Sequence, residues 1–166
     1  MTVKEFEILF RKLYLPLGMY ALRIVGDADD AEDVVQETFI RAWEAVRDGK
    51  EVADFKSYIY MCVRNECISH LRSRKETVGV EQMPETIDEA IDTSERDARI
   101  WSAIDRLPQR CREVFLLSKR DGLSQEEIAS ELGISVKTVK NQMTKAYAEL
   151  RGALSMRHKP FFLPFL

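Results

Sequence analysis

The stretch LSQEEIASELGISVKTVKNQM, from Leu123 to Met143, carries two helix-start signals separated by a glycine. Ser124 and Glu127 have the spacing of a capping box, in which each side chain bonds the amide of the other residue. Gly133 is the residue type that most easily ends a helix in the left-handed conformation. Ser135 can then cap a second helix. The spacing therefore predicts two short helices joined by a tight turn.

Two helices joined by a glycine-containing turn of about three or four residues form a helix-turn-helix, whose second helix fits the major groove of DNA. In the second predicted helix, polar side chains occupy the faces that the apolar stripe leaves free. They are Ser135, Lys137, Thr138, Lys140, Asn141, Gln142 and Lys145. Asparagine and glutamine can pair with adenine, whereas lysine is a flexible point charge suited to phosphate. For this stretch alone, a helical hairpin with a solvated lysine face is the alternative.

Length and composition indicate one or two folded domains. The chain has 166 residues, of which 45% are hydrophobic, and a net charge of −3. No apolar run reaches the ~18 residues that span a bilayer, and the N-terminus lacks a signal peptide's apolar core. We therefore expect a cytoplasmic protein without membrane insertion. Cys62, Cys67 and Cys111 lack metal-site spacing, so we expect reduced thiols, no metal and no cofactor.

Charge is unevenly distributed along the chain. Residues 136–159 hold six basic side chains and one acidic side chain. Residues 81–105 hold eight acidic and two basic side chains. Such segregation indicates different surfaces for different partners.

The apolar spacing is helical nearly throughout and no stretch alternates as a strand does, which predicts an all-α fold of two small domains. Pro16 predicts a break that divides residues 1–75 into four helices. Residues 76–94 lose the periodicity and gain acids, which predicts a flexible linker. A second helical domain over 95–166 would contain the helix-turn-helix. Its apolar end, PFFLPFL, would either pack on that domain or dock on a partner.

Two stretches of the first domain suggest binding. FKSYIYMCVRNECISHLRSRK, residues 55–75, interleaves cations and aromatic rings, as proteins that hold single-stranded nucleic acid do, with stacking worth ~1–3 kcal/mol per base. Its candidate residues are Phe55, Tyr58, Arg64, Asn65, Arg72 and Arg74. DAEDVVQETFIRAWEAV, residues 30–46, places polar side chains outward on a helix. They are Asp33, Gln36, Glu37 and Arg41. Taken singly, both sets are also compatible with a core and a solvated surface.

Together and in this order, these stretches resemble the sigma factors of bacterial RNA polymerase, the sigma-70 family. Residues 30–46 resemble the second conserved region of these factors, and residues 55–75 resemble their promoter-melting and −10-recognition region. Residues 107–151 resemble their fourth region. Length and order are similar to those of the small extracytoplasmic-function group, which keeps only two domains.

The resemblance implies a transcription initiation factor, not an enzyme, that binds core RNA polymerase, recognises the −35 and −10 promoter elements and assists melting. The polar side of the helix with Asp33, Gln36, Glu37 and Arg41 would dock on the polymerase β′ subunit. The loop before Phe55 would capture a flipped base, the helix carrying Asn65 would contact the −10 element, and the helix from Val136 would read the −35 element. The implied partners are the β′ and β subunits, promoter DNA and an anti-sigma factor.

Some residues depart from the family pattern. Ser69 stands where an aspartate is common, Tyr58 where a tryptophan is common, and Asn141-Gln142 where Ser-Arg or Ser-His is frequent, so the promoter sequence is not predicted. One alternative is a dimeric DNA-binding regulator, which would need a receiver or sensor domain. A helical adaptor that binds only protein would leave Asn141 and Gln142 unexplained. For an enzyme, the chain lacks a glycine-rich phosphate loop and a paired nucleophile and base.

Overall fold

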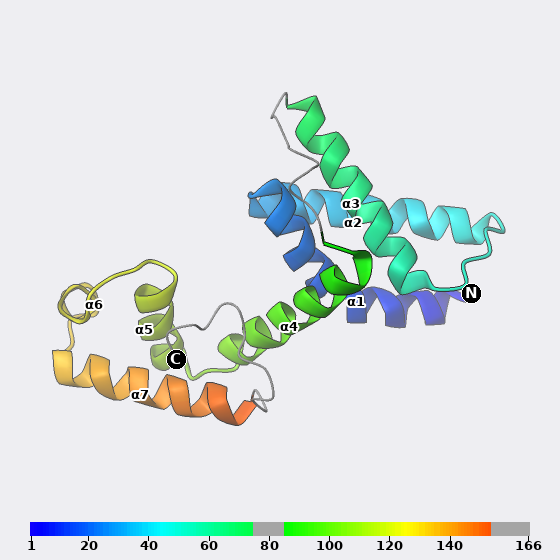
Figure 1. Cartoon of the computed structure of the whole chain (residues 1–166). Helices are drawn as coiled ribbons and strands as arrows, with labels where there is room; N and C mark the ends of the chain where they lie inside the picture. Colours follow the sequence, from blue (N-terminus) through cyan, green and yellow to red (C-terminus); the bar gives the residue numbers. More distant parts are fainter. Residues whose placement is uncertain (75–84, 154–166) are drawn as a thin grey trace. The chain divides into compact units, whose positions relative to one another are not determined.

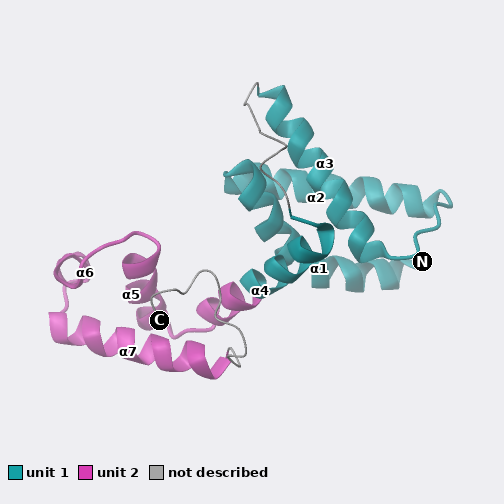
Figure 2. Ribbon diagram, in the orientation of Figure 1, with its two compact units in different colours: residues 1–98 teal, residues 99–166 magenta. Residues whose placement is uncertain are grey.

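The computed structural model describes residues 1–74 and 85–153, and in these ranges the chain forms helices and connecting turns without a strand (Figure 1). The all-α prediction is therefore confirmed. The helices are α1 (Val3–Val25), α2 (Ala28–Arg47), α3 (Phe55–Ser73), α4 (Ile87–Asp105), α5 (Gln109–Lys119), α6 (Gln125–Leu132) and α7 (Val136–Ala153). They belong to two compact units, Met1–Ala98 and Arg99–Leu166 (Figure 2). The apolar end PFFLPFL lies outside the described residues.

In the first unit, α1, α2 and α3 each pack against the other two. Leu17, Val35 and Ile59, one from each helix, are almost completely buried at their centre. At one end of this core the ring of Phe6 contacts the rings of Phe39, Trp43 and Phe55, with centroids 4.8–6.1 Å apart. These contacts bury the apolar stripe of each helix and leave its polar side exposed.

The predicted break at Pro16 is wrong, because α1 continues through this proline. A proline inside a helix removes one backbone hydrogen bond and costs about 3 kcal/mol. Leu13, Pro16, Leu17 and Tyr20 are all buried, and packing of this face offsets that cost. Three helices, not four, therefore precede residue 75.

The predicted linker is too long, because α4 begins at Ile87 and not near residue 95. Ala90 and Ile91 are buried in the core of the first unit. Ser94 is fully buried, and its hydroxyl accepts a hydrogen bond of 3.3 Å from Arg23. The first unit therefore ends at Ala98, well beyond the predicted boundary at residue 75. Residues 75–84 lie outside the described part of the chain.

In the second unit, α5, α6 and α7 pack on one another and share a core with the second half of α4. The N-cap hydrogen bonds of Ser124 and Ser135 that the sequence predicts are present. The Ser124 hydroxyl accepts from the Glu127 amide at 3.1 Å, and the Ser135 hydroxyl accepts from the Thr138 amide at 3.1 Å. Gly133 ends α6 with a φ of 63°, in the left-handed region. The helix-turn-helix is thus formed by α6, its tight turn and α7.

Candidate protein and nucleic-acid interfaces

The predicted polymerase-binding side chains lie together on the outer face of α2. Asp33, Gln36, Glu37 and Arg41 are all exposed. Their neighbours Val34, Val35 and Thr38 are buried, because α2 turns its apolar stripe to the core. The sequence therefore predicted both the face and its exposure.

Asp33, Gln36 and Glu37 line a shallow pocket of about 370 Å³ together with Glu66 and His70 of α3. Arg41 lies beside the pocket residues, where its guanidinium donates to Glu37 at 2.9 Å and to Glu66 at 3.0 Å.

Glu66 and His70 were not among the predicted residues. Their spacing of four residues on α3 places them on one side of that helix, which could have indicated a shared face with α2. The acidic surface therefore belongs to two helices and not to α2 alone.

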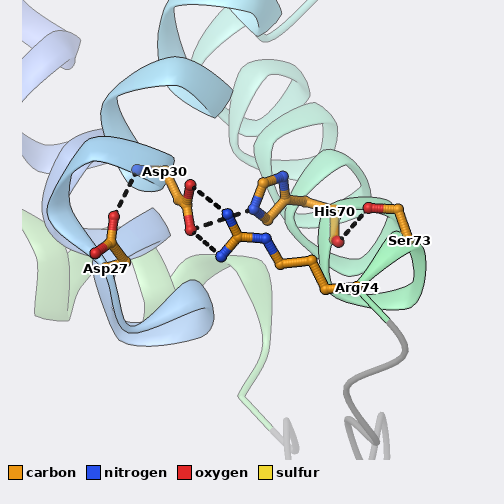
Figure 3. A network of polar contacts seen from close by, with 5 residues as sticks. All are labelled: Asp27, Asp30, His70, Ser73 and Arg74. Carbon is orange, nitrogen blue, oxygen red and sulfur yellow. Dashed lines mark hydrogen bonds and ion pairs between the residues drawn. The ribbon is translucent and has the colours of Figure 1, made fainter.

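A polar network joins the start of α2 to the end of α3 (Figure 3). The Asp30 carboxylate accepts two hydrogen bonds from Arg74, at 2.5 and 3.0 Å. His70 Nε2 lies 3.4 Å from the same carboxylate, a contact that becomes an ion pair when the histidine is protonated. The Asp27 side chain caps α2 by accepting from the Asp30 amide at 3.0 Å. Arg74, predicted as a DNA contact, is therefore held in a contact within the first unit.

The outer face of α3 carries three of the predicted DNA-binding residues. Tyr58, Asn65 and Arg72 lie seven residues apart, which places them on one side of the helix. Asn65 and Arg72 are exposed, and Tyr58 and Arg64 are half-buried. Tyr58, Asn65 and Arg72 form a polar and aromatic strip on the side of α3 away from the buried Ile59, Val63 and Cys67.

Phe55 does not join this strip. Its side chain is only 6% exposed and packs against Phe6 with a ring-centroid distance of 5.5 Å. Because a buried ring cannot stack on a base, the prediction that Phe55 contacts DNA directly is not retained. The residue before it, Asp54, caps α3 by accepting from the Ser57 amide.

The loop between α2 and α3 contains Lys50, a cation that was not among the predicted residues. Lys50 lies over the ring of Tyr58, 4.5 Å from its centroid, and donates to its hydroxyl at 3.3 Å. Gly49, with a φ of 100°, and Lys50 line a pocket of about 420 Å³ that also includes Val46 and Val52. The eight-residue separation of Lys50 and Tyr58 gave no sequence signal for this contact.

The outer face of α7 carries the predicted −35 residues. Lys137, Lys140, Asn141 and Lys145 are exposed. Thr138 and Gln142 are half-buried. Val139, Met143, Ala146 and Leu150 form the buried face. Ser135 caps α7, and its hydroxyl lies 2.9 Å from that of Thr138, so these two side chains support the start of the helix.

Three further properties of the described part of the chain are its potential metal ligands, its cysteines and the apolar length of its helices. In residues 1–74 and 85–153, no group of three or more histidine, cysteine or acidic side chains could hold a metal ion. Cys62, Cys67 and Cys111 are free thiols. None of the helices in these ranges is long and apolar enough to cross a membrane.

The fold defines an all-helical protein of two units, the second of which contains a helix-turn-helix of the kind found in DNA-binding proteins. Residues 9–77 match the family model of sigma-70 region 2, and residues 97–150 match that of sigma-70 region 4. The chain belongs to the sigma-70 family, as the sequence motifs predicted.

Two sigma factors of known description agree with this assignment. The chain is 34% identical to the RNA polymerase sigma-E factor of Streptomyces coelicolor, over 93% of this chain and 89% of that protein. It is 30% identical to the ECF RNA polymerase sigma factor SigE of Mycolicibacterium smegmatis, over 81% of this chain but only 56% of that protein. A solved structure of the sigma factor RpoE with the anti-sigma factor NepR from Bartonella quintana is 22% identical, with 94% of this chain and all of that chain covered and a TM-score of 0.40.

Proposed function

We propose that this protein is a transcription initiation factor of the extracytoplasmic-function type. It binds core RNA polymerase, recognises the −35 and −10 promoter elements and assists promoter melting. The observation that carries the proposal is that the two matched regions expose surfaces of opposite charge. An acidic face on α2 and α3 contains Glu37 and Glu66, and a cationic face on α7 contains Lys137, Lys140 and Lys145.

The α2 face suits a protein partner. Asp33, Gln36 and Glu37 are exposed and border a pocket whose other acid is Glu66. Phosphate is repelled by such a surface, whereas basic side chains of a protein are attracted to it. We assign this face, with Arg41, to the β′ subunit of the polymerase; contacts with the β subunit complete the complex.

The α3 face suits the −10 element. Tyr58 offers a ring for stacking, Asn65 an amide for a base edge, and Arg72 a charge for phosphate. Arg64 lies next to Asn65 and adds a second cation. The loop of residues 48–54 holds a flipped base beside Lys50, and the buried Phe55 supports that loop from below.

The α7 face suits the −35 element. Asn141 and Gln142 have the amide geometry that pairs with adenine, and Lys137, Lys140 and Lys145 contact phosphates. Ser135 and Thr138 fix the start of the helix so that its first turn enters the major groove.

Melting of the promoter DNA requires more free energy than the binding of one flipped base supplies. Each base-pair step of DNA is held by roughly 1.4 kcal/mol of stacking, and several steps must open. The protein therefore biases melting by holding the displaced strand, and core polymerase contributes the rest. These roles need no catalytic residue. We propose that the protein acts in the cytoplasm and that an anti-sigma factor is its regulatory partner.

A titration with core RNA polymerase tests the assignment of the two faces. The double variant Asp33→Asn/Glu37→Gln, which removes charge and keeps shape, should bind core polymerase about tenfold more weakly, equivalent to about 1.4 kcal/mol. The double variant Lys140→Ala/Asn141→Ala serves as the control and should keep its affinity for core. Equal losses in both variants, or none in the first, would contradict the proposal.

A further inference from the structure

His70 lies near the end of α3, where that helix meets the start of α2 (Figure 3). Its side chain is 25% exposed, and it lines the same pocket as Asp33, Gln36 and Glu37 of α2. Histidine is the side-chain type whose ordinary charge change falls between pH 5 and pH 8. The acidic face on α2 and α3 therefore contains a group whose charge can change near neutral pH.

One ring nitrogen of His70 faces the carboxylate of Asp30. This nitrogen, Nε2, is buried, and within residues 1–74 and 85–153 it makes no hydrogen bond. It lies 3.4 Å from a carboxylate oxygen of Asp30. A protonated ring can donate to that oxygen in a charge-assisted hydrogen bond, whereas the neutral ring leaves Nε2 without a partner in this part of the chain. Asp30 thus provides a partner for the charged form of the ring.

Six charged side chains surround His70 or line its pocket, and the residues that line the pocket all come from α2 and α3. The acids are Asp30, Asp33, Glu37 and Glu66, and the cations are Arg41, which binds Glu37 and Glu66, and Arg74, which binds Asp30. Four acids and two cations leave a net charge of −2 around the neutral ring. A proton on the ring halves this charge.

We propose that His70 is a proton-sensitive site in the acidic face on α2 and α3, and that protonation of its ring weakens the binding of core RNA polymerase. This inference rests on the proposed function of that face. Basic side chains of a protein partner are attracted to a negative surface and are repelled by each cation added to it. Because the removal of two charges should weaken core binding about tenfold, one added cation should weaken it about threefold.

Three variants separate the charge of the ring from its shape. His70→Gln has a polar side chain that does not titrate. His70→Lys carries a positive charge throughout the pH range of interest, since lysine ordinarily titrates near pH 10. The matched control is His158→Gln, because His158 is the other histidine of the sequence. It lies outside the described residues.

The experiment measures the dissociation constant of the full-length protein and core polymerase at pH 5.5 and at pH 8.0. The ratio of the two constants is compared between proteins, so that titration of the polymerase itself cancels. We expect this ratio, acid over alkaline, to be about threefold larger for wild type and His158→Gln than for His70→Gln and His70→Lys. At pH 8.0, His70→Lys should bind core polymerase about threefold more weakly than His70→Gln.

Proton NMR of the free protein measures the titration of the ring without any change at position 70. The histidine ring signal that remains in His158→Gln belongs to His70, and it should shift between pH 5.5 and pH 8.0. A signal that stays in place, or equal ratios of dissociation constants for wild type and His70→Gln, would overturn the inference. Absence of core binding by the wild-type protein at both pH values would instead overturn the proposed function.

Discussion

At the scale of single residues, burial changes the acid–base chemistry of the core thiols. Cys67 is fully buried on the inner face of α3, and desolvation raises its pKa from an ordinary 9.0 to about 12. The folded state therefore holds the proton more tightly than the unfolded chain does. The resulting stabilisation is complete below pH 9 and is lost as the pH rises from about 9 towards 12.

We predict a measurable pH dependence from this thiol. Between pH 8 and pH 10, the free energy of unfolding of the wild-type protein should fall by about 1 kcal/mol more than that of Cys67→Ala. Urea unfolding in the presence of reductant measures the difference. Tyr20 and Tyr60, whose pKa values are also raised by burial, are common to both proteins and cancel. Equal slopes for the two proteins would contradict the burial of Cys67.

The candidate sites show which residue-level features a sequence reveals. Asn65 and Lys140 were found because helical spacing separates outer faces from inner ones. The sequence does not show that Phe55 meets Phe6 or that Arg74 meets Asp30. Both contacts join residues more than 40 positions apart, so no local pattern encodes them.

At the scale of elements, two glycines of the second unit should respond oppositely to the same substitution. Gly133 ends α6 with a φ of +63° and Gly152 lies within α7; a Cβ at either would meet no atom within 4 Å. Gly133→Ala should therefore destabilise the unit by about 1 kcal/mol through backbone strain alone. Gly152→Ala should stabilise it by about 0.5 kcal/mol, because alanine loses less entropy in a helix.

Chemical denaturation of the two variants beside wild type checks the signs. Gly133→Asn provides a further comparison, since asparagine adopts the left-handed conformation more readily than alanine does. A loss or a gain shared by Gly133→Ala and Gly152→Ala would show that the turn between α6 and α7 differs from the one described.

The helix-turn-helix could be predicted at this scale because its signals are local. Ser124 and Ser135 each accept from the amide three residues later, and Gly133 donates its own amide to the carbonyls of Ala129 and Ser130. The start of α4 was missed for the opposite reason. Its buried face uses Ala90 and Ser94, small residues that weaken an apolar pattern, and it is stabilised by α1 through Arg23. Likewise, α1 continues through Pro16 because it packs on α2 and α3, and these contacts are not visible in the local sequence.

At the scale of the whole molecule, we predict that the first unit needs the first half of α4 for its full stability. A fragment of residues 1–98 should be more stable than a fragment of residues 1–75 by at least about 2 kcal/mol, because burial of a side chain such as Ile91 is worth about 1.5–3 kcal/mol. Urea unfolding of the two fragments measures the difference.

A matched pair in the full chain provides the control. Ile91→Ala should lower the stability of the first unit by about 2–4 kcal/mol, whereas Asp92→Ala, at an exposed position, should change it by less than about 0.5 kcal/mol. If the two fragments were equally stable, the first unit would end at residue 75, as the sequence alone suggested.

The central claim is that one acidic surface binds core polymerase while two other surfaces read promoter DNA. Run-off transcription with core polymerase on a library of random upstream sequences tests it most directly. The wild-type protein should enrich two separate sequence blocks; Lys140→Ala/Asn141→Ala should alter only the −35 block, and Asn65→Ala only the −10 block. Absence of promoter-directed transcripts with the wild-type protein, or unchanged preferences in both variants, would contradict the claim.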